Sequence, residues 1–283
     1  VSPSVEYLSC GKLKYLSIQS IYLIPLLNNF ENNFPVIETL DISCTNSENF
    51  DSHLETIISS KTLKCLKIDY TANVESFLNL EGKIKSSIEE LKLTDVMWEF
   101  VFDLLEVERF PCLKKLYIET NSTNLDLEEV LEKLEMFPRL TSLTLTGHFS
   151  LSNEKLPFTF KNLKFLCLEI YEGTFNLDYI LDCMPNLIGL KIAGQSLKKL
   201  KLQSLVGIRY LELLFDLSDY DGDIVNIIKN TPRLIQMTVW DSSCNSDCSI
   251  PFVSELAYYF KELKRHFNNE LQFEINLNCL PVK

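Results

Sequence analysis

The chain has 283 residues, of which 46% are apolar and 23% charged, which is an ordinary composition for a soluble globular protein. Its formal net charge of −12 works against a polyanionic partner, because affinity for DNA or RNA rests mainly on basic side chains that neutralise phosphates. The sequence contains no run of about 18 or more apolar residues, the length that a membrane span needs. We therefore expect neither a nucleic acid nor a membrane as partner.

The nine cysteines are odd in number and scattered along the whole length. Scattered cysteines without paired spacing are typical of small buried side chains in a reducing compartment, so we expect an intracellular protein of the cytoplasm or nucleus. Cys244 and Cys248 lie close together, but none of the three histidines stands at a ligand spacing to them. We interpret that segment as a plain loop, and we expect no metal and no cofactor.

One hexad, apolar-x-x-apolar-x-apolar, recurs ten times. Successive hexads start 24, 26, 25, 25, 27, 23, 24, 21 and 26 residues apart, which indicates an internal repeat. The ten are LKYLSI at Leu13, IETLDI at Ile37, LKCLKI at Leu63, IEELKL at Ile88, LKKLYI at Leu113, LTSLTL at Leu140, LKFLCL at Leu163, LIGLKI at Leu187, IRYLEL at Ile208 and LIQMTV at Leu234.

Each hexad ends in an alternation of apolar and polar residues, the pattern of a strand with one buried face. Amphipathic stretches with helical spacing lie between hexads, for example 126–137 and 98–110. The sequence therefore predicts an α/β solenoid, a horseshoe with a concave parallel β-sheet and a mostly helical convex side. The spacing from Leu187 to Ile208 leaves no room for a helix, so an extended segment is expected there.

We expect residues 1–283 to form a single solenoid domain, with about ten repeats over roughly 13–242. A capping helix at 252–267 and a last strand at 271–277 should close the C-terminal end, within roughly 250–280.

Five prolines mark the return from helix to strand, each two residues before the first apolar residue of a hexad. Proline cannot continue a helix and biases its predecessor towards extended backbone. The five dipeptides are Phe34-Pro35, Phe110-Pro111, Phe137-Pro138, Met184-Pro185 and Thr231-Pro232.

These hexads and prolines resemble the irregular leucine-rich repeats of F-box/LRR proteins, from about Leu13 to Val239. The asparagine or cysteine that usually follows the strand in regular leucine-rich repeats is mostly absent, and only Asn121 fits. The resemblance implies the substrate-recognition part of an adaptor in an SCF-type ubiquitin ligase. It also implies a Skp-type adaptor as a further partner, reached through an N-terminal F-box. Twelve residues before the first hexad do not hold an F-box, so we expect that module to be missing from this chain.

The third, fifth and seventh positions counted from each hexad start should form columns on the concave sheet, where solenoids commonly bind their partners. Lysines of three consecutive repeats predict a basic cluster, and large aromatic side chains occupy positions that should be exposed to solvent. The candidate binding residues are Lys67, Lys92, Lys115, Tyr117, Phe165, Tyr210 and Trp240. A capping segment could instead cover Trp240, which lies in the last repeat.

We find no phosphate-binding glycine loop, nucleophile elbow or HExxH motif, so the sequence predicts no enzyme and no catalytic residue. The leading hypothesis is a protein-protein interaction module that binds another protein through the concave sheet. One alternative is a small-molecule or hormone co-receptor. Another is an acidic inhibitor or scaffold that binds a basic protein.

Overall fold

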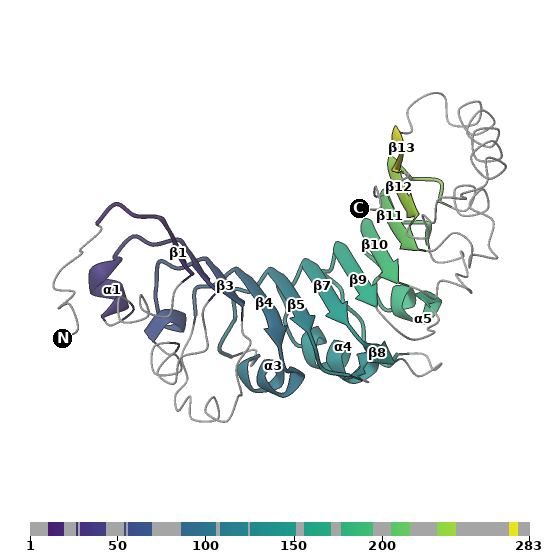
Figure 1. Ribbon diagram of the computed structural model, residues 1–283. Coiled ribbons are helices and arrows are strands. Elements are labelled where there is room, and N and C mark those ends of the chain that lie inside the picture. Colours follow the sequence, from purple (N-terminus) through teal and green to yellow (C-terminus); the bar gives the residue numbers. More distant parts are fainter. Residues whose placement is uncertain are drawn as a thin grey trace, which may run out of the picture. The chain divides into compact units, whose positions relative to one another are not determined.

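A computed structural model describes most of the repeats (Figure 1). The described residues are 11–19, 27, 29–43, 54, 56–69, 86–105, 108–123, 125–150, 156–170, 177–194, 205–215, 231–241 and 272–276. The chain divides into two compact units, which are treated separately below. Unit 1 comprises Val1–Thr123 and Lys133–Gly147, and unit 2 comprises Asn124–Glu132 and His148–Lys283.

Each of the ten hexads contributes one strand, which begins at its third residue. In unit 1 neighbouring strands pair in the order β1, β2, β3, β4, β5, β7, and in unit 2 in the order β9, β10, β11, β12, β13, and every pair is parallel. The strands of unit 1 are β1 (Tyr15–Ile18), β2 (Thr39–Ile42), β3 (Cys65–Asp69), β4 (Glu90–Val96), β5 (Lys115–Thr120) and β7 (Ser142–Gly147). Those of unit 2 are β9 (Phe165–Ile170), β10 (Gly189–Gly194), β11 (Tyr210–Phe215), β12 (Gln236–Asp241) and β13 (Gln272–Asn276).

One backbone carbonyl holds the start of each strand to the repeat before it. The amides of Glu38 and Thr39 both donate to the carbonyl of Lys14, and those of Lys114 and Lys115 both donate to that of Glu89. The same two-to-one bond recurs in unit 2, where the amides of Arg209 and Tyr210 donate to the carbonyl of Ile188. Equivalent hexad residues therefore stand side by side in both units.

The proline dipeptides form tight turns just before the strands. The residue before each proline is buried, and its carbonyl accepts the amide of the first apolar residue of the hexad, as from Leu113 to Phe110. Proline suits the second position of such a four-residue turn because its ring fixes φ near the required value. Val206 takes the place of proline in the repeat of Ile208, whose amide donates to the carbonyl of Leu205.

The apolar hexad residues form the core of each unit. The middle residue is buried in every repeat except at Leu16, which is half-buried in the first strand. Helix α3 (Trp98–Leu104) lies on one side of β4 and β5 (Figure 1), and its Trp98, Val101 and Leu104 are buried. The remaining described helices are α1 (Phe30–Asn33), α4 (Leu127–Glu135) and α5 (Leu177–Asp182). The short strands β6 (Leu125–Asp126) and β8 (Phe149–Ser150) form a separate parallel pair in unit 2.

The parallel strands at the period of the hexads confirm a leucine-rich-repeat-like solenoid fold. The helix expected over 126–137 is α4, and the Asp126 carboxylate accepts the amide of Glu128 at its start. The helix expected over 98–110 is shorter, because α3 ends at Leu104. The last strand, expected at 271–277, is β13. The expected capping helix, the Cys244 and Cys248 segment and the extended segment before Ile208 lie largely outside the described residues.

Substitution of a middle hexad leucine should destabilise unit 1. Leu116→Ala and Leu143→Ala each remove a buried side chain, so each should lower the free energy of unfolding by about 2–5 kcal/mol in urea denaturation. Met136→Ala is the control, because that side chain is 54% exposed and its loss should change little. Equal stability of Leu116→Ala and Met136→Ala would contradict the assigned strand register.

Candidate functional site

The candidate site is the sheet face that bears the third and fifth residues counted from each hexad start, here called the open face. Most of these side chains are half-buried or exposed, whereas their neighbours along each strand are buried. The outward direction expected for the seventh position does not hold throughout, because Thr146 and Ala193 are buried. The fifth-position Thr238 is buried as well. The open face is therefore narrower than the three predicted columns.

In unit 1 the open face brings two of the predicted lysines side by side. Lys67 of β3 and Lys92 of β4 are register partners. The Lys92 ammonium lies 4.5 Å from the centre of the Tyr117 ring, close enough for a cation-π interaction. The Tyr117 hydroxyl donates to the Glu119 carboxylate at 2.9 Å. Among the described residues, the Lys67 ammonium forms no ion pair, so it is available to an anionic group of a partner.

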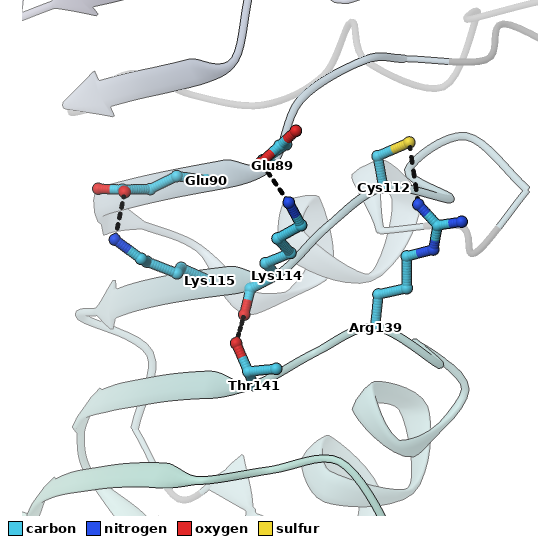
Figure 2. Close-up of polar contacts among 7 residues, drawn as sticks. All are labelled: Glu89, Glu90, Cys112, Lys114, Lys115, Arg139 and Thr141. Atoms are coloured by element: carbon cyan, nitrogen blue, oxygen red, sulfur yellow. Dashed lines mark hydrogen bonds and ion pairs between the residues drawn. The ribbon is translucent and has the colours of Figure 1, made fainter.

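The third predicted lysine belongs to another column and is already paired. Lys115 of β5 is the register partner of Glu90 in β4, and its ammonium lies 3.2 Å from that carboxylate (Figure 2). Cys65 is the register partner of Glu90 on the other side. Burial, and secondly the charge of Glu90, raises the pKa of the Cys65 thiol, which disfavours its thiolate. The basic cluster expected from the sequence therefore reduces to Lys67 and Lys92.

In unit 2 the open face carries two exposed aromatic rings separated by a glycine. Phe165 of β9 and Tyr210 of β11 are 44% and 41% exposed, and Gly189 of β10 is the register partner of both. A Cβ atom at Gly189 would lie only 2.5 Å from Cδ1 of Phe165, so the Phe165 ring lies over the glycine backbone. The ring can lie there because residue 189 has no side chain.

An ion triad joins the next two columns of unit 2, with Lys191 and Glu212 at the fifth position and Glu169 at the seventh. The Lys191 ammonium lies 3.1 Å from the Glu169 carboxylate and 3.5 Å from that of Glu212. Burial lowers the pKa of Lys191, but the hydrogen bond that its ammonium donates to Glu169 and the charge of Glu212 outweigh burial and raise the pKa overall. The triad carries one net negative charge beside the two aromatic rings.

Trp240 belongs to β12, where it is the register partner of Leu214. Its side chain lies outside the described residues, so its predicted role at the binding face stays a prediction. The structure thus places Lys67, Lys92, Lys115 and Tyr117 in unit 1. It places Phe165 and Tyr210 in unit 2.

Sequence reasoning missed a row of charges at the strand starts, formed by the second residue of each hexad. In unit 1 the first five members of this row alternate in sign and the sixth is the uncharged Thr141; the five are Lys14, Glu38, Lys64, Glu89 and Lys114. The ammonium-to-carboxylate distance is 2.6 Å both for Lys14 with Glu38 and for Lys114 with Glu89 (Figure 2). The hydrogen bond from Lys114 lowers the pKa of Glu89. Aligning the hexads and comparing their second residues would have revealed this row, because lysine and glutamate alternate there.

The described residues offer little sign of small-molecule or metal chemistry. A pocket of about 390 Å³ in unit 2 is lined by residues 156–159 with Asp182 and Cys183, and none of these belongs to the open face. Burial raises the pKa of Cys183 to about 12, and its thiol donates to the Ile180 carbonyl, so it is a poor nucleophile. No group of three potential metal ligands occurs within the described part of the chain. Within the same residues, no helix has the length and apolar character of a membrane span.

Comparison with known proteins gives only distant structural likenesses. No family model and no curated protein sequence matches the chain. Among solved structures, the chain is similar to one described as the crystal structure of the TLR13-ssRNA13 complex, with 16% identity and a TM-score of 0.40. The match covers 79% of this chain and 41% of that one, so the chain spans less than half of that structure's length. At this level the likeness says nothing about the ligand of this chain.

The contact between Gly189 and Phe165 can be tested by a double-mutant cycle. Gly189→Ala should destabilise the protein by about 1–3 kcal/mol, because the added methyl group displaces the Phe165 ring. In a Phe165→Ala background the same substitution should cost much less, since no ring is left to displace. The measurement is urea denaturation of the four proteins. An equal cost in both backgrounds would show that the ring does not occupy the space over Gly189.

Proposed function

We propose that this chain binds another protein through the open face of its sheet and that it does not catalyse a reaction. One observation carries the proposal: Phe165 and Tyr210 stand more than 40% exposed on a sheet face, two strands apart. Large aromatic side chains in exposed clusters are the usual composition of binding hot spots. We name a protein as the partner because the net charge of −12 disfavours a nucleic acid.

The two aromatic rings would supply most of the affinity. The contact with Gly189 limits the freedom of the Phe165 ring before binding, so less side-chain entropy is lost when a partner covers it. Tyr210 would add its hydroxyl as a polar contact at the rim of the same patch.

In unit 1, Lys67 and Lys92 would guide an acidic segment of the partner. Two adjacent ammonium groups create a positive potential that attracts carboxylates over a distance of about a Debye length, roughly 8 Å at physiological salt. Such charges change the rate of association more than the lifetime of the complex. The Tyr117 ring beneath Lys92 adds apolar surface at the same place.

More specifically, we propose that the chain is a substrate receptor of an SCF-type ubiquitin ligase and acts inside the cell. We also propose that the side opposite the open face is mostly helical. Both proposals rest on the resemblance of the hexads and the proline dipeptides to F-box/LRR repeats. The described helices α3 and α4, which follow β4 and β5 in the chain, are in keeping with the helical side. The full-length reading frame tests the receptor role, because an upstream F-box would support it and an unrelated upstream domain would argue against it.

Removal of the two rings should weaken partner binding without unfolding the protein. Candidate partners are proteins that the wild-type chain retains from a cell extract and that the Phe165→Ala/Tyr210→Ala variant does not. The control variant Val36→Ala/Met136→Ala also loses two exposed apolar side chains and should still retain them. With such a partner purified, calorimetry should show a loss of about 1–4 kcal/mol of binding free energy in the double variant. Thermal denaturation should show little change. Loss of stability with unchanged affinity would mean that both rings serve the fold and that the binding surface lies elsewhere.

Charge reversal at the adjacent lysines should slow association with the same partner. Lys67→Glu/Lys92→Glu should lower the association rate constant more than it raises the dissociation rate constant, and added salt should diminish the difference. Stopped-flow fluorescence gives both rate constants. Lys12→Glu/Lys61→Glu is the control of equal charge change, because these exposed lysines lie in the turns before β1 and β3. Equal slowing in both double variants would indicate a general charge effect and no specific guidance by the open face.

A further inference from the structure

The strand starts of unit 2 differ in charge from those of unit 1. The four described strand-start segments are 156–165, 184–189, 205–210 and 231–236, and together they contain four cations and no carboxylate. The cations, here called the basic edge, are Lys161, Lys164, Arg209 and Arg233. All four are exposed, and within the described residues none forms an ion pair or a side-chain hydrogen bond. In a chain of net charge −12, such an acid-free cationic strip is unexpected.

In unit 1, the charges at the second hexad position pair with one another. There, glutamates alternate with lysines and form ion pairs with them at 2.6 Å, as between Glu89 and Lys114. In unit 2 the same row reads Lys164, Ile188, Arg209 and Ile235, so isoleucines take the positions of the glutamates. The amides of Ile188, Arg209 and Ile235 bond to the carbonyls of Lys164, Ile188 and Arg209 respectively, which fixes their order along the edge.

Apolar side chains at this edge are exposed as well. Ile235 is 42% exposed and Val206, in the turn before β11, is 55% exposed. Phe165 and Tyr210 directly follow Lys164 and Arg209 in the chain. The edge therefore presents cations and apolar groups in alternation, and water solvates the apolar members poorly.

We infer that the basic edge of unit 2 is a second binding surface, which takes a protein segment carrying both acidic and apolar side chains. Charge complementarity selects the acidic groups, since the described segments of the edge have four cations that form no ion pair there and contain no carboxylate. Ile188, Val206 and Ile235 select the apolar groups, which would leave water on contact.

Two features favour such a segment over a nucleic acid. A phosphate backbone offers no apolar group that could pack against Ile188 and Ile235. The carboxylates of Glu169 and Glu212 lie on β9 and β11, the strands that follow Lys164 and Arg209, and they would repel a continuous polyanion. Asp182, at the end of α5, adds a further negative charge in the neighbouring repeat.

The spacing of the edge suggests a probe. Neighbouring strands stand about 4.8 Å apart, so Lys164 and Arg209, which directly precede β9 and β11, lie roughly 10 Å apart. In an extended peptide, residues three apart are separated by about the same distance. We choose a fluorescein-labelled synthetic peptide that repeats Glu-Leu-Ser. Its two controls are Lys-Leu-Ser, which reverses the charge, and Glu-Ser-Ser, which removes the apolar groups.

Fluorescence anisotropy with the full chain tests the inference. Glu-Leu-Ser should bind the wild-type protein, and Lys164→Glu/Arg209→Glu should weaken this binding by about tenfold or more. Lys12→Glu/Lys61→Glu changes the net charge equally but lies at the strand starts of unit 1, so it should leave binding nearly unchanged. Binding that is lost in Lys67→Glu/Lys92→Glu but kept in Lys164→Glu/Arg209→Glu would place the peptide on the open face of unit 1 and reject the edge. Lys-Leu-Ser should not bind, and Glu-Ser-Ser should bind more weakly than Glu-Leu-Ser.

Several outcomes would overturn the inference. They are no binding of Glu-Leu-Ser, equal weakening by all three charge-reversed double variants, and equal binding of Glu-Ser-Ser. Tighter binding of single-stranded RNA with the same dependence on Lys164 and Arg209 would assign the edge to a nucleic acid instead. If thermal denaturation shows that the edge variant is unfolded, Lys164→Gln/Arg209→Gln replaces it and should give a smaller loss in the same direction. Retained binding in that folded variant would reject the edge. Each result is independent of whether Phe165 and Tyr210 bind a partner.

Discussion

The backbone carbonyl at the second hexad position is the contact on which the arrangement of both units depends. By accepting two amides of the next repeat, as Lys14 does from Glu38 and Thr39, it brings successive strands to one starting line. Side chains alternate between faces along a strand, so a common start turns the middle residue of each hexad to the same face, which is buried in every repeat after the first. It also aligns the open-face residues into columns. The charged row, the lysine pair and the aromatic pair all follow from this alignment.

Much of the fold could be predicted because its signals are local and repeated. The hexad carries the strand phase, and the residue before each proline becomes a buried turn residue, as Phe110 and Phe137 do. The end of α3 could not be predicted so well, because the apolar pattern continues past Leu104 while the backbone helix does not. Helix ends depend on local hydrogen bonds, such as that from the Leu105 amide to the Val101 carbonyl, which a residue pattern does not reveal.

The candidate site could be predicted only as a set of columns. Register placed Lys67 beside Lys92, as the repeat spacing indicated. The pairing of Lys115 with Glu90 and the position of the Phe165 ring over Gly189 depend on side-chain rotamers and on neighbours in other repeats. The buried Thr146 and Ala193 show the same limit, since alternation predicts the face of a residue but not what covers it. The charges at the strand starts were visible in the sequence, but only at a hexad position that the strand pattern does not use.

The fixed strand start also determines where in a repeat the chain can gain or lose residues. The spacing of hexads varies from 21 to 27 residues, yet the described strand starts of each unit keep their pairing, so the chain accommodates the difference after one hexad and before the next turn. The shift in β4 is one such place: Asp95 adopts φ 58°, and the register slips between Leu93 and Val96. An added residue there lengthens a connection, whereas an added residue inside a hexad would turn the rest of that strand to the opposite face. Insertions and deletions should therefore accumulate in the connections, and the open face can keep its columns while repeat lengths diverge.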